Sequence, residues 1–236
     1  MPDLQDTNVL IFGLQMAAAM VCSVGGALAA GRKRLDMVGV VFVSFVAAVG
    51  GGSLRDLLLD RNPVFWLAQP SYLTVSLVAG ALTWLYIRRW PAPGRFLNFV
   101  DAFGLGLFTI SGIQIAQEMG QSTLICLVMG LITGVAGGLL RDLLCGEIPS
   151  VFQGGELYAS ASLFGGGIYF LAETGGGDPR LCALAGAGTV VGLRLAALRL
   201  GWRLPVLEIG YPKASHASHA RGVRRTGGSG QRPRKG

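Results

Sequence analysis

The sequence predicts an all-α membrane protein with seven transmembrane helices, arranged as two inverted three-helix repeats and one extra helix. Three observations support this fold class. Of the 236 residues, 51% are hydrophobic and only 14% are charged, whereas a soluble domain carries roughly 25% charged residues. Apolar stretches long enough to cross a bilayer recur seven times. Finally, a ten-residue segment at the end of the second stretch recurs at the end of the fifth.

The seven apolar stretches define the expected helices. A transmembrane helix needs about 20 mostly apolar residues, because each residue adds 1.5 Å along its axis. In chain order the spans are 8–30, 37–59, 68–87, 98–117, 122–145, 157–173 and 180–199. Asp36, Asp101 and Glu156 each stand at the beginning of a span. Helix N-termini favour negative charge, so we expect these three residues to act as helix caps.

The first span has the charge pattern of a retained helix. Acidic residues, Asp3 and Asp6, precede it, and the basic cluster Arg32-Lys33-Arg34 follows it. A cleavable signal peptide has the opposite polarity. The pattern therefore predicts an uncleaved first helix whose N-terminus lies outside the cell.

The remaining loops support the same orientation. With the N-terminus outside, the inside segments are 31–36, 88–97, 146–156 and the tail, and they hold most of the basic residues. The outside loops hold only Arg61 and Arg180. Basic residues accumulate in cytoplasmic loops. The chain is thus expected to be a multi-pass protein of the cell inner (plasma) membrane with a cytoplasmic C-terminus.

An internal duplication underlies the repeats. Residues 49–58 read VGGGSLRDLL and residues 135–144 read VAGGLLRDLL, with eight of ten positions identical at an offset of 86 residues. The same offset pairs Gly26 with Gly112, Pro63 with Pro149, and Tyr72 with Tyr158.

The duplication predicts the domain organisation. Each copy contains three expected helices, so the second copy enters the membrane from the opposite side and is inverted relative to the first. The expected boundaries are 1–90 for the first repeat, 91–176 for the second, 177–200 for the seventh helix and 201–236 for a basic tail. The tail is too polar to bury a core, so we expect it to be disordered and to contact anionic membrane lipids.

The glycines of the motif are candidates for an ion path. Glycine destabilises a helix interior by about 1 kcal/mol relative to alanine, so Gly50, Gly51 and Gly52, and likewise Gly137 and Gly138, favour a helix break. Backbone freed by such a break is tolerated only against protein or a water-filled cavity, where carbonyl groups can replace the hydration shell of a cation. The alternative is that the glycines let two helices approach closely.

The charged half of the motif has several open interpretations. Adjacent residues on a helix do not face each other, so we expect pairs across the repeats, Arg55 with Asp142 and Arg141 with Asp56. Each arginine could instead cap carbonyl groups freed by its own helix break. On a straight helix Arg55 lies about 27 Å from the start of its span, which would make it an interfacial anchor. A role in a gate is the remaining alternative, because an unneutralised arginine repels a permeant cation.

Other function classes have less support in the sequence. The net charge is +7, but its basic residues lie in loops and tail, which is atypical of a nucleic-acid interface. Four cysteines, Cys22, Cys126, Cys145 and Cys182, lie far apart without metal-ligand spacing. No nucleophile–base set or phosphate loop is recognisable. We therefore expect no metal, no cofactor, no nucleic-acid partner and no enzymatic activity.

The duplicated motif, the following proline and aromatic residue, and the seventh helix resemble the prokaryotic members of the trimeric intracellular cation (TRIC) channel family. The resemblance covers residues 8–199. It implies a homotrimer with one pore per subunit, lined by glycine-kinked second and fifth helices and passing K⁺ and Na⁺. The pore positions it implies are the nine motif residues Gly50, Gly51, Gly52, Arg55, Asp56, Gly137, Gly138, Arg141 and Asp142. Ala136 replaces the first glycine in the second copy, so equal kinking of both helices does not follow.

Two functions remain open at this point. The first is a monovalent-cation channel for potassium and sodium. The second is a secondary transporter of a small neutral solute such as glycine, because the same duplicated unit is also described as a glycine-transporter domain. Inverted repeats with broken helices are typical of carriers as well as channels.

Overall fold

The computed structural model describes residues 4–90, 96–153 and 157–202. Within these residues the chain forms eight α-helices and one short 3-10 helix and contains no strand. The helices are α1 (Leu4–Arg32), α2 (Met37–Leu58), α3 (Phe65–Ala68), α4 (Ser71–Arg89), α5 (Phe96–Glu118), α6 (Thr123–Leu144), η1 (Ser150–Phe152), α7 (Ala159–Thr174) and α8 (Pro179–Leu200). Glu156 and nearly all of the predicted tail lie outside the described residues.

An all-helical membrane fold is confirmed. Seven of the helices coincide with the predicted spans, and five of them, α1, α2, α5, α6 and α8, are long and apolar enough to cross a membrane. The shorter helices α4 and α7 are not among these five, so the count of seven transmembrane helices stays a prediction. The short helices α3 and η1 were not expected. Both lie in the segment that follows a motif-bearing helix.

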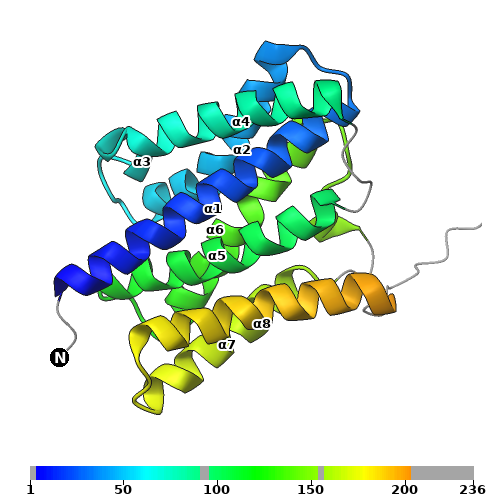
Figure 1. Ribbon diagram of the computed structural model, residues 1–236. Helices are drawn as coiled ribbons and strands as arrows, with labels where there is room; N and C mark the ends of the chain where they lie inside the picture. The colour runs from blue at the N-terminus through cyan, green and yellow to red at the C-terminus, as the bar shows by residue number, and fades with distance from the viewer. Residues whose placement is uncertain (1–3, 91–95, 154–156, 203–236) are drawn as a thin grey trace, which may run out of the picture. The chain divides into compact units, whose positions relative to one another are not determined.

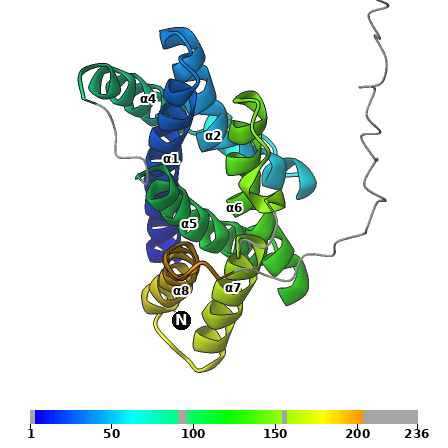
Figure 2. The ribbon, with the colours of Figure 1, turned by 90° about the vertical axis from the view of Figure 1, so that its right-hand side faces the viewer.

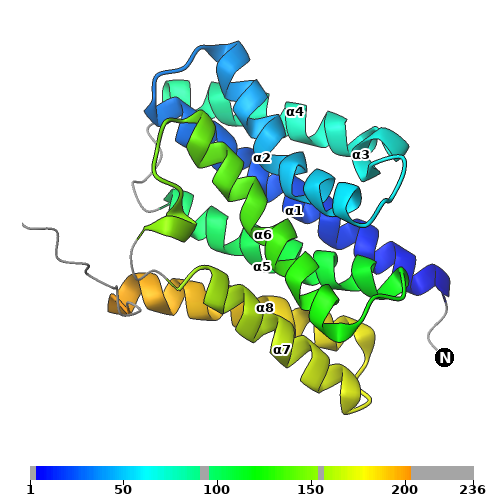
Figure 3. The same ribbon diagram turned by 180° about the vertical axis from the view of Figure 1, so that it is seen from behind.

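The helices pack in two neighbouring groups (Figure 1). In the first group α1, α2 and α4 contact one another, and in the second α5 contacts α6, α7 and α8. The groups meet where α1 packs on α5 and α2 packs on α6. Figure 2 shows α7 and α8 on the side of α5 away from α1 and α2. Viewed from behind, α2 and α6 lie in front of α1 and α5 (Figure 3).

The expected glycine breaks in α2 and α6 are wrong. Both helices run as uninterrupted α-helix through their glycines. A Cβ atom added at Gly51 would clash with the carbonyl oxygen of Thr133 on α6, and one at Gly137 would lie 2.6 Å from the carbonyl oxygen of Ala47 on α2. The two glycines therefore allow the backbones of α2 and α6 to touch, which was the alternative interpretation.

The contacts of these glycines are reciprocal between the two copies. Gly51 and Gly137 occupy equivalent positions at the offset of 86, and so do Ala47 and Thr133. The contact of Gly51 with Thr133 and the contact of Gly137 with Ala47 therefore join equivalent pairs of residues from the two copies. The fold places the ends of α2 and α6, with their Arg-Asp pairs, on either side of this crossing (Figure 3).

Candidate functional site

The first Arg-Asp pair forms within α2. The Nε and Nη2 atoms of Arg55 donate hydrogen bonds of 2.8 and 2.7 Å to Oδ1 of Asp56, and both side chains are fully buried, with 0% exposure. The second pair has the same form, because Nε of Arg141 donates to Oδ1 of Asp142 at 2.8 Å. The predicted cross-repeat pairs are therefore wrong. The long arginine side chain curls around its helix and reaches a neighbour that a shorter side chain on the same helix would not face.

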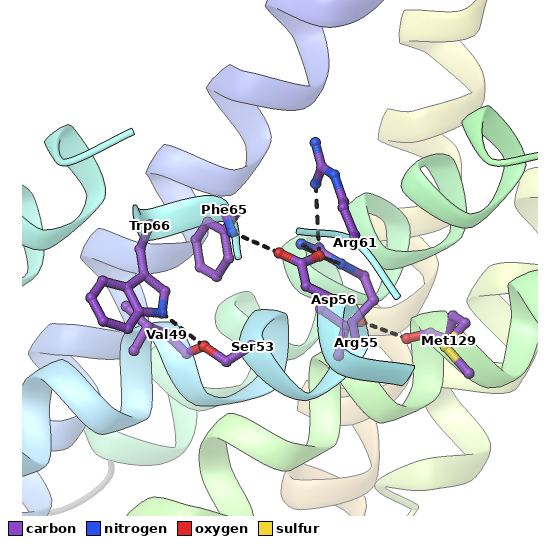
Figure 4. A network of polar contacts seen from close by, with 9 residues as sticks. Val49, Ser53, Arg55, Asp56, Arg61, Phe65, Trp66 and Met129 are labelled. Atoms are coloured by element: carbon purple, nitrogen blue, oxygen red, sulfur yellow. Dashed lines mark hydrogen bonds and ion pairs between the residues drawn. The ribbon is translucent and has the colours of Figure 1, made fainter. Parts of the chain in front are cut away.

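The other carboxylate oxygen of each aspartate anchors the chain that follows its helix. Oδ2 of Asp56 accepts a hydrogen bond of 2.7 Å from the Phe65 backbone N–H (Figure 4). Oδ2 of Asp142 accepts from the backbone N–H of Ser150 at 3.0 Å and from its hydroxyl at 3.2 Å. These bonds fold α3 and η1 back over their helices. Arg55 is thus buried by the returning chain rather than by a break in α2.

Aromatic packing completes the enclosure of Arg55. Its guanidinium carbon lies 5.5 Å from the centre of the Phe65 ring, a distance suited to a cation–π interaction. Tyr72 packs edge-on against the same ring, with 4.9 Å between the ring centres. The guanidinium of Arg61 approaches Asp56 from the solvent side, with 3.7 Å between Nη1 and Oδ1 (Figure 4). One aspartate thus lies between two arginines at this end of the bundle.

Arg141 differs from Arg55 in having a second carboxylate partner. Its Nη1 donates a hydrogen bond of 2.6 Å to Oδ1 of Asp101.

Asp101 lies one turn inside α5, which begins at Phe96, so its predicted role as a helix cap is wrong. Asp36 does cap α2, accepting a 2.7 Å hydrogen bond from the Gly39 backbone. The sequence carried one signal for Asp101, a carboxylate inside an apolar stretch that needs a partner.

The equivalent position in the first repeat holds Gln15. This residue precedes Asp101 by the repeat offset of 86 and is likewise buried. Among the described residues neither its Oε1 nor Nη1 of Arg55 has a hydrogen-bond partner. The two ends of the bundle are therefore electrostatically unequal, with two carboxylates on Arg141 and one on Arg55.

Cavities lie at both ends of α1. The cavity near its C-terminal end has a volume of about 230 Å³ and is lined by residues that include Ala29, Asp101 and Arg141. The cavity near its N-terminal half has a volume of about 200 Å³ and is lined by residues that include Gln15 and Phe65. We call them the Arg141 cavity and the Gln15 cavity. Gln15 and Ala29 are about 21 Å apart along α1 at 1.5 Å per residue.

A third, narrow cavity lies deeper in the bundle. Its volume is about 10 Å³, and its lining includes Gly137, Gly138 and Tyr158. Asp101 and Arg141 line both this narrow cavity and the Arg141 cavity, so they stand where the two meet. A Cβ atom at Gly138 would lie 2.8 Å from the Tyr158 hydroxyl and 3.3 Å from Oδ1 of Asp101. Gly138 thus leaves room at this junction.

Comparison with known proteins follows the same division into repeats. A family model described as "Glycine transporter" matches residues 12–88 and again residues 98–174, and these two stretches are separated by the offset of 86. A crystal structure of the TRIC trimeric intracellular cation channel orthologue from Rhodobacter sphaeroides superposes with a TM-score of 0.77 at 36% identity, covering 81% of this chain and 98% of that one. This chain belongs to the TRIC family.

Other relatives of this TRIC-family protein span it to a similar extent. A prokaryotic TRIC channel solved in 0.5 M KCl matches with a TM-score of 0.76 at 26% identity, over 84% of this chain and 100% of that one. A UPF0126 membrane protein from Vibrio cholerae is 38% identical over 86% of this chain and 85% of the relative. The UPF0126 inner membrane protein YadS of Escherichia coli is 36% identical over 85% of this chain and 98% of the relative.

The motif residues of this TRIC-family protein fall into four environments. Gly137 and Gly138 line the narrow cavity, together with Arg141. Gly50, Gly51 and Gly52 pack instead against Leu140, Thr133 and Phe65. Arg55 and Asp56 are enclosed beneath α3, whereas Asp142 lines the Arg141 cavity.

Proposed function

We propose that this TRIC-family protein is a monovalent-cation channel that passes potassium and sodium. The proposal takes cation conduction from the similar proteins described as TRIC cation channels. From the trimeric orthologue it also takes a homotrimer. In the proposed assembly each subunit has its own pore, lined by α2 and α6. We place the protein in the plasma membrane, as the relative described as an inner membrane protein suggests.

One observation carries the proposal, the polar interior between α1, α2, α5 and α6. Ionisable residues inside a membrane-spanning bundle are expensive and mark ion paths. Here Asp101 and Arg141 stand where a wide cavity narrows toward the glycines of α6. Arginine in a cation path repels the ion unless it is neutralised, and the carboxylates of Asp101 and Asp142 neutralise Arg141.

The proposed orientation puts the Arg141 cavity on the cytoplasmic side and the Gln15 cavity outside. It follows from the basic cluster after α1, which includes Arg32 and Lys33. The reciprocal contacts of Gly51 and Gly137 support an inverted relation between the two three-helix repeats. In this orientation the axis relating the repeats passes through the α2–α6 crossing in the plane of the membrane.

A second candidate function is secondary transport of a small neutral solute such as glycine. The description of the matching family model favours it. Cavities at both ends of a bundle with a narrow centre would suit alternating access as well as a pore. The two functions differ in how many ions cross per second and in whether transport saturates with solute.

Recording from the purified protein in planar bilayers separates the two candidates. In symmetric KCl we expect discrete unitary currents, because a channel passes ions without a conformational cycle for each one. A KCl gradient should give a reversal potential close to that of potassium. Saturable glycine uptake into proteoliposomes, without unitary current, would overturn the channel in favour of the carrier.

The Phe65 ring is expected to restrict the path at the Gln15 cavity. The ring lines this cavity and also covers Gly52, where an added Cβ atom would lie 2.5 Å from it. Phe65→Ala should therefore increase the unitary current or the fraction of time spent open in the bilayer recording. Phe152→Ala is the control, because Phe152 occupies the corresponding turn of the second repeat but is exposed. Equal currents in both variants would contradict a restriction at Phe65.

A further inference from the structure

We propose that Asp101 determines the cation preference of the pore and makes it asymmetric, with the stronger cation attraction at the narrow end of the Arg141 cavity. This inference rests on the proposed channel function and deepens it. Neither the duplicated motif nor the sequence repeat points to Asp101, because its counterpart in the first repeat is an uncharged Gln15.

Asp101 stands between the Arg141 cavity and the narrow cavity. Its side chain is 8% exposed and its Oδ1 accepts the hydrogen bond from Nη1 of Arg141. It lines both the Arg141 cavity and the narrow cavity. Of the side chains that line the narrow cavity, only Asp101 and Arg141 carry formal charges. A cation moving between the two cavities would therefore pass the Asp101 carboxylate.

Charges are unevenly distributed along the Arg141 cavity. The wide Arg141 cavity as a whole does not attract cations, because basic side chains outnumber acidic ones along its wall. The four basic residues are Arg32, Lys33, Arg141 and Arg194, and the three acidic residues are Asp101, Asp142 and Glu147. Lys33 and Glu147 form an ion pair with each other at its exposed rim. At the narrow end, however, Arg141 is bonded to two carboxylates, Asp101 and Asp142. This cluster has a net charge of −1, and without Asp101 it would be neutral.

The other end of the bundle supplies an internal comparison. Arg55 there is bonded to Asp56 alone, and Gln15 brings no charge to the position of Asp101. Arg61 and Glu118, which line the Gln15 cavity, add one charge of each sign. The Arg55–Asp56 pair and the charges that line the Gln15 cavity therefore sum to zero, whereas the bonded cluster of Arg141, Asp101 and Asp142 carries a net charge of −1. Cation current is expected to rectify because local cation concentration rises near the negative cluster.

The test compares charge variants of the full-length protein in planar bilayers with KCl on both sides. Asp101→Asn should lower the unitary conductance several-fold at about 0.01 M KCl, where the Debye length is about 30 Å. The deficit should nearly vanish at 1 M KCl, where that length is about 3 Å. In a KCl gradient its reversal potential should move toward that of chloride. Asp101→Glu, which keeps the charge, should restore both properties.

Two further variants sharpen the result. Gln15→Glu adds a carboxylate at the equivalent position and should raise current entering from the Gln15 end, reducing rectification. Asp60→Asn removes an exposed carboxylate from the turn after α2, where an asparagine tolerates the backbone φ of 53°. It should behave as the unmodified protein, because Asp60 lines none of the three cavities.

The outcomes separate this inference from the proposed function. A conducting wild-type protein whose Asp101→Asn variant loses current equally at all salt concentrations would overturn the inference, because a structural defect does not depend on screening. Unchanged selectivity in that variant would also overturn it. If Asp101→Asn does not fold, Gln15→Glu decides alone, and unaltered rectification there overturns the proposal. Absence of any current from the wild-type protein would instead overturn the channel function itself.

Discussion

Replacing Asp56 by Asn is expected to destabilise the protein far more than the same change at the equivalent Asp142. Arg55 is completely buried and has one carboxylate partner within hydrogen-bonding distance. Removing the charge of that partner leaves a buried guanidinium uncompensated, which costs about 3–5 kcal/mol. Arg141 keeps its 2.6 Å bond to Asp101 when Asp142 is changed, so a smaller loss is expected. Thermal unfolding of the detergent-solubilised variants measures the difference.

The second carboxylate supplies the control for this comparison. Adding Asp101→Asn to Asp142→Asn removes both partners of Arg141 and should bring the loss close to that of Asp56→Asn. Exchanging charges between the repeats, Arg55→Asp with Asp142→Arg, should not restore stability, because each pair forms within one helix. Equal unfolding temperatures for Asp56→Asn and Asp142→Asn would contradict the role given to Asp101.

A methyl group at Gly51 is expected to disrupt the crossing of α2 and α6. The added atom would clash with the backbone carbonyl of Thr133, and backbone cannot rotate away as a side chain can. Overpacking of this kind costs about 1–3 kcal/mol, against a gain of about 1 kcal/mol in helix propensity. Gly51→Ala should therefore lower the unfolding temperature, and Gly137→Ala should do the same through the carbonyl of Ala47.

The neighbouring glycine is a matched control. A methyl group at Gly50 would meet only the end of the flexible Leu140 side chain, at 2.5 Å. Gly50→Ala should thus be nearly neutral, as the natural Ala136 at the equivalent position suggests. If Gly50→Ala and Gly51→Ala lower the unfolding temperature equally, the glycines act through helix flexibility rather than through close packing.

The sequence by itself determined the membrane class, the helix spans and the duplication. Each depends on local composition or on a pattern along the chain, so no knowledge of neighbouring helices is needed. The predicted span 37–59 and the observed helix Met37–Leu58 differ by one residue. Asp36 was recognised as a cap for the same reason, since its hydrogen bond to Gly39 is local.

Only the tertiary structure decided what the motif residues touch. Arg55 and Asp56 pair within one helix and are buried because α3 folds back over them. The sequence offers no pattern for that return. Gly51 leaves room for the backbone of Thr133, which lies on another helix. Asp101 pairs with Arg141 across 40 residues of chain. The pattern of apolar residues along the chain shows which segments are removed from water. The partner of a buried charge depends instead on packing between helices that are distant in sequence.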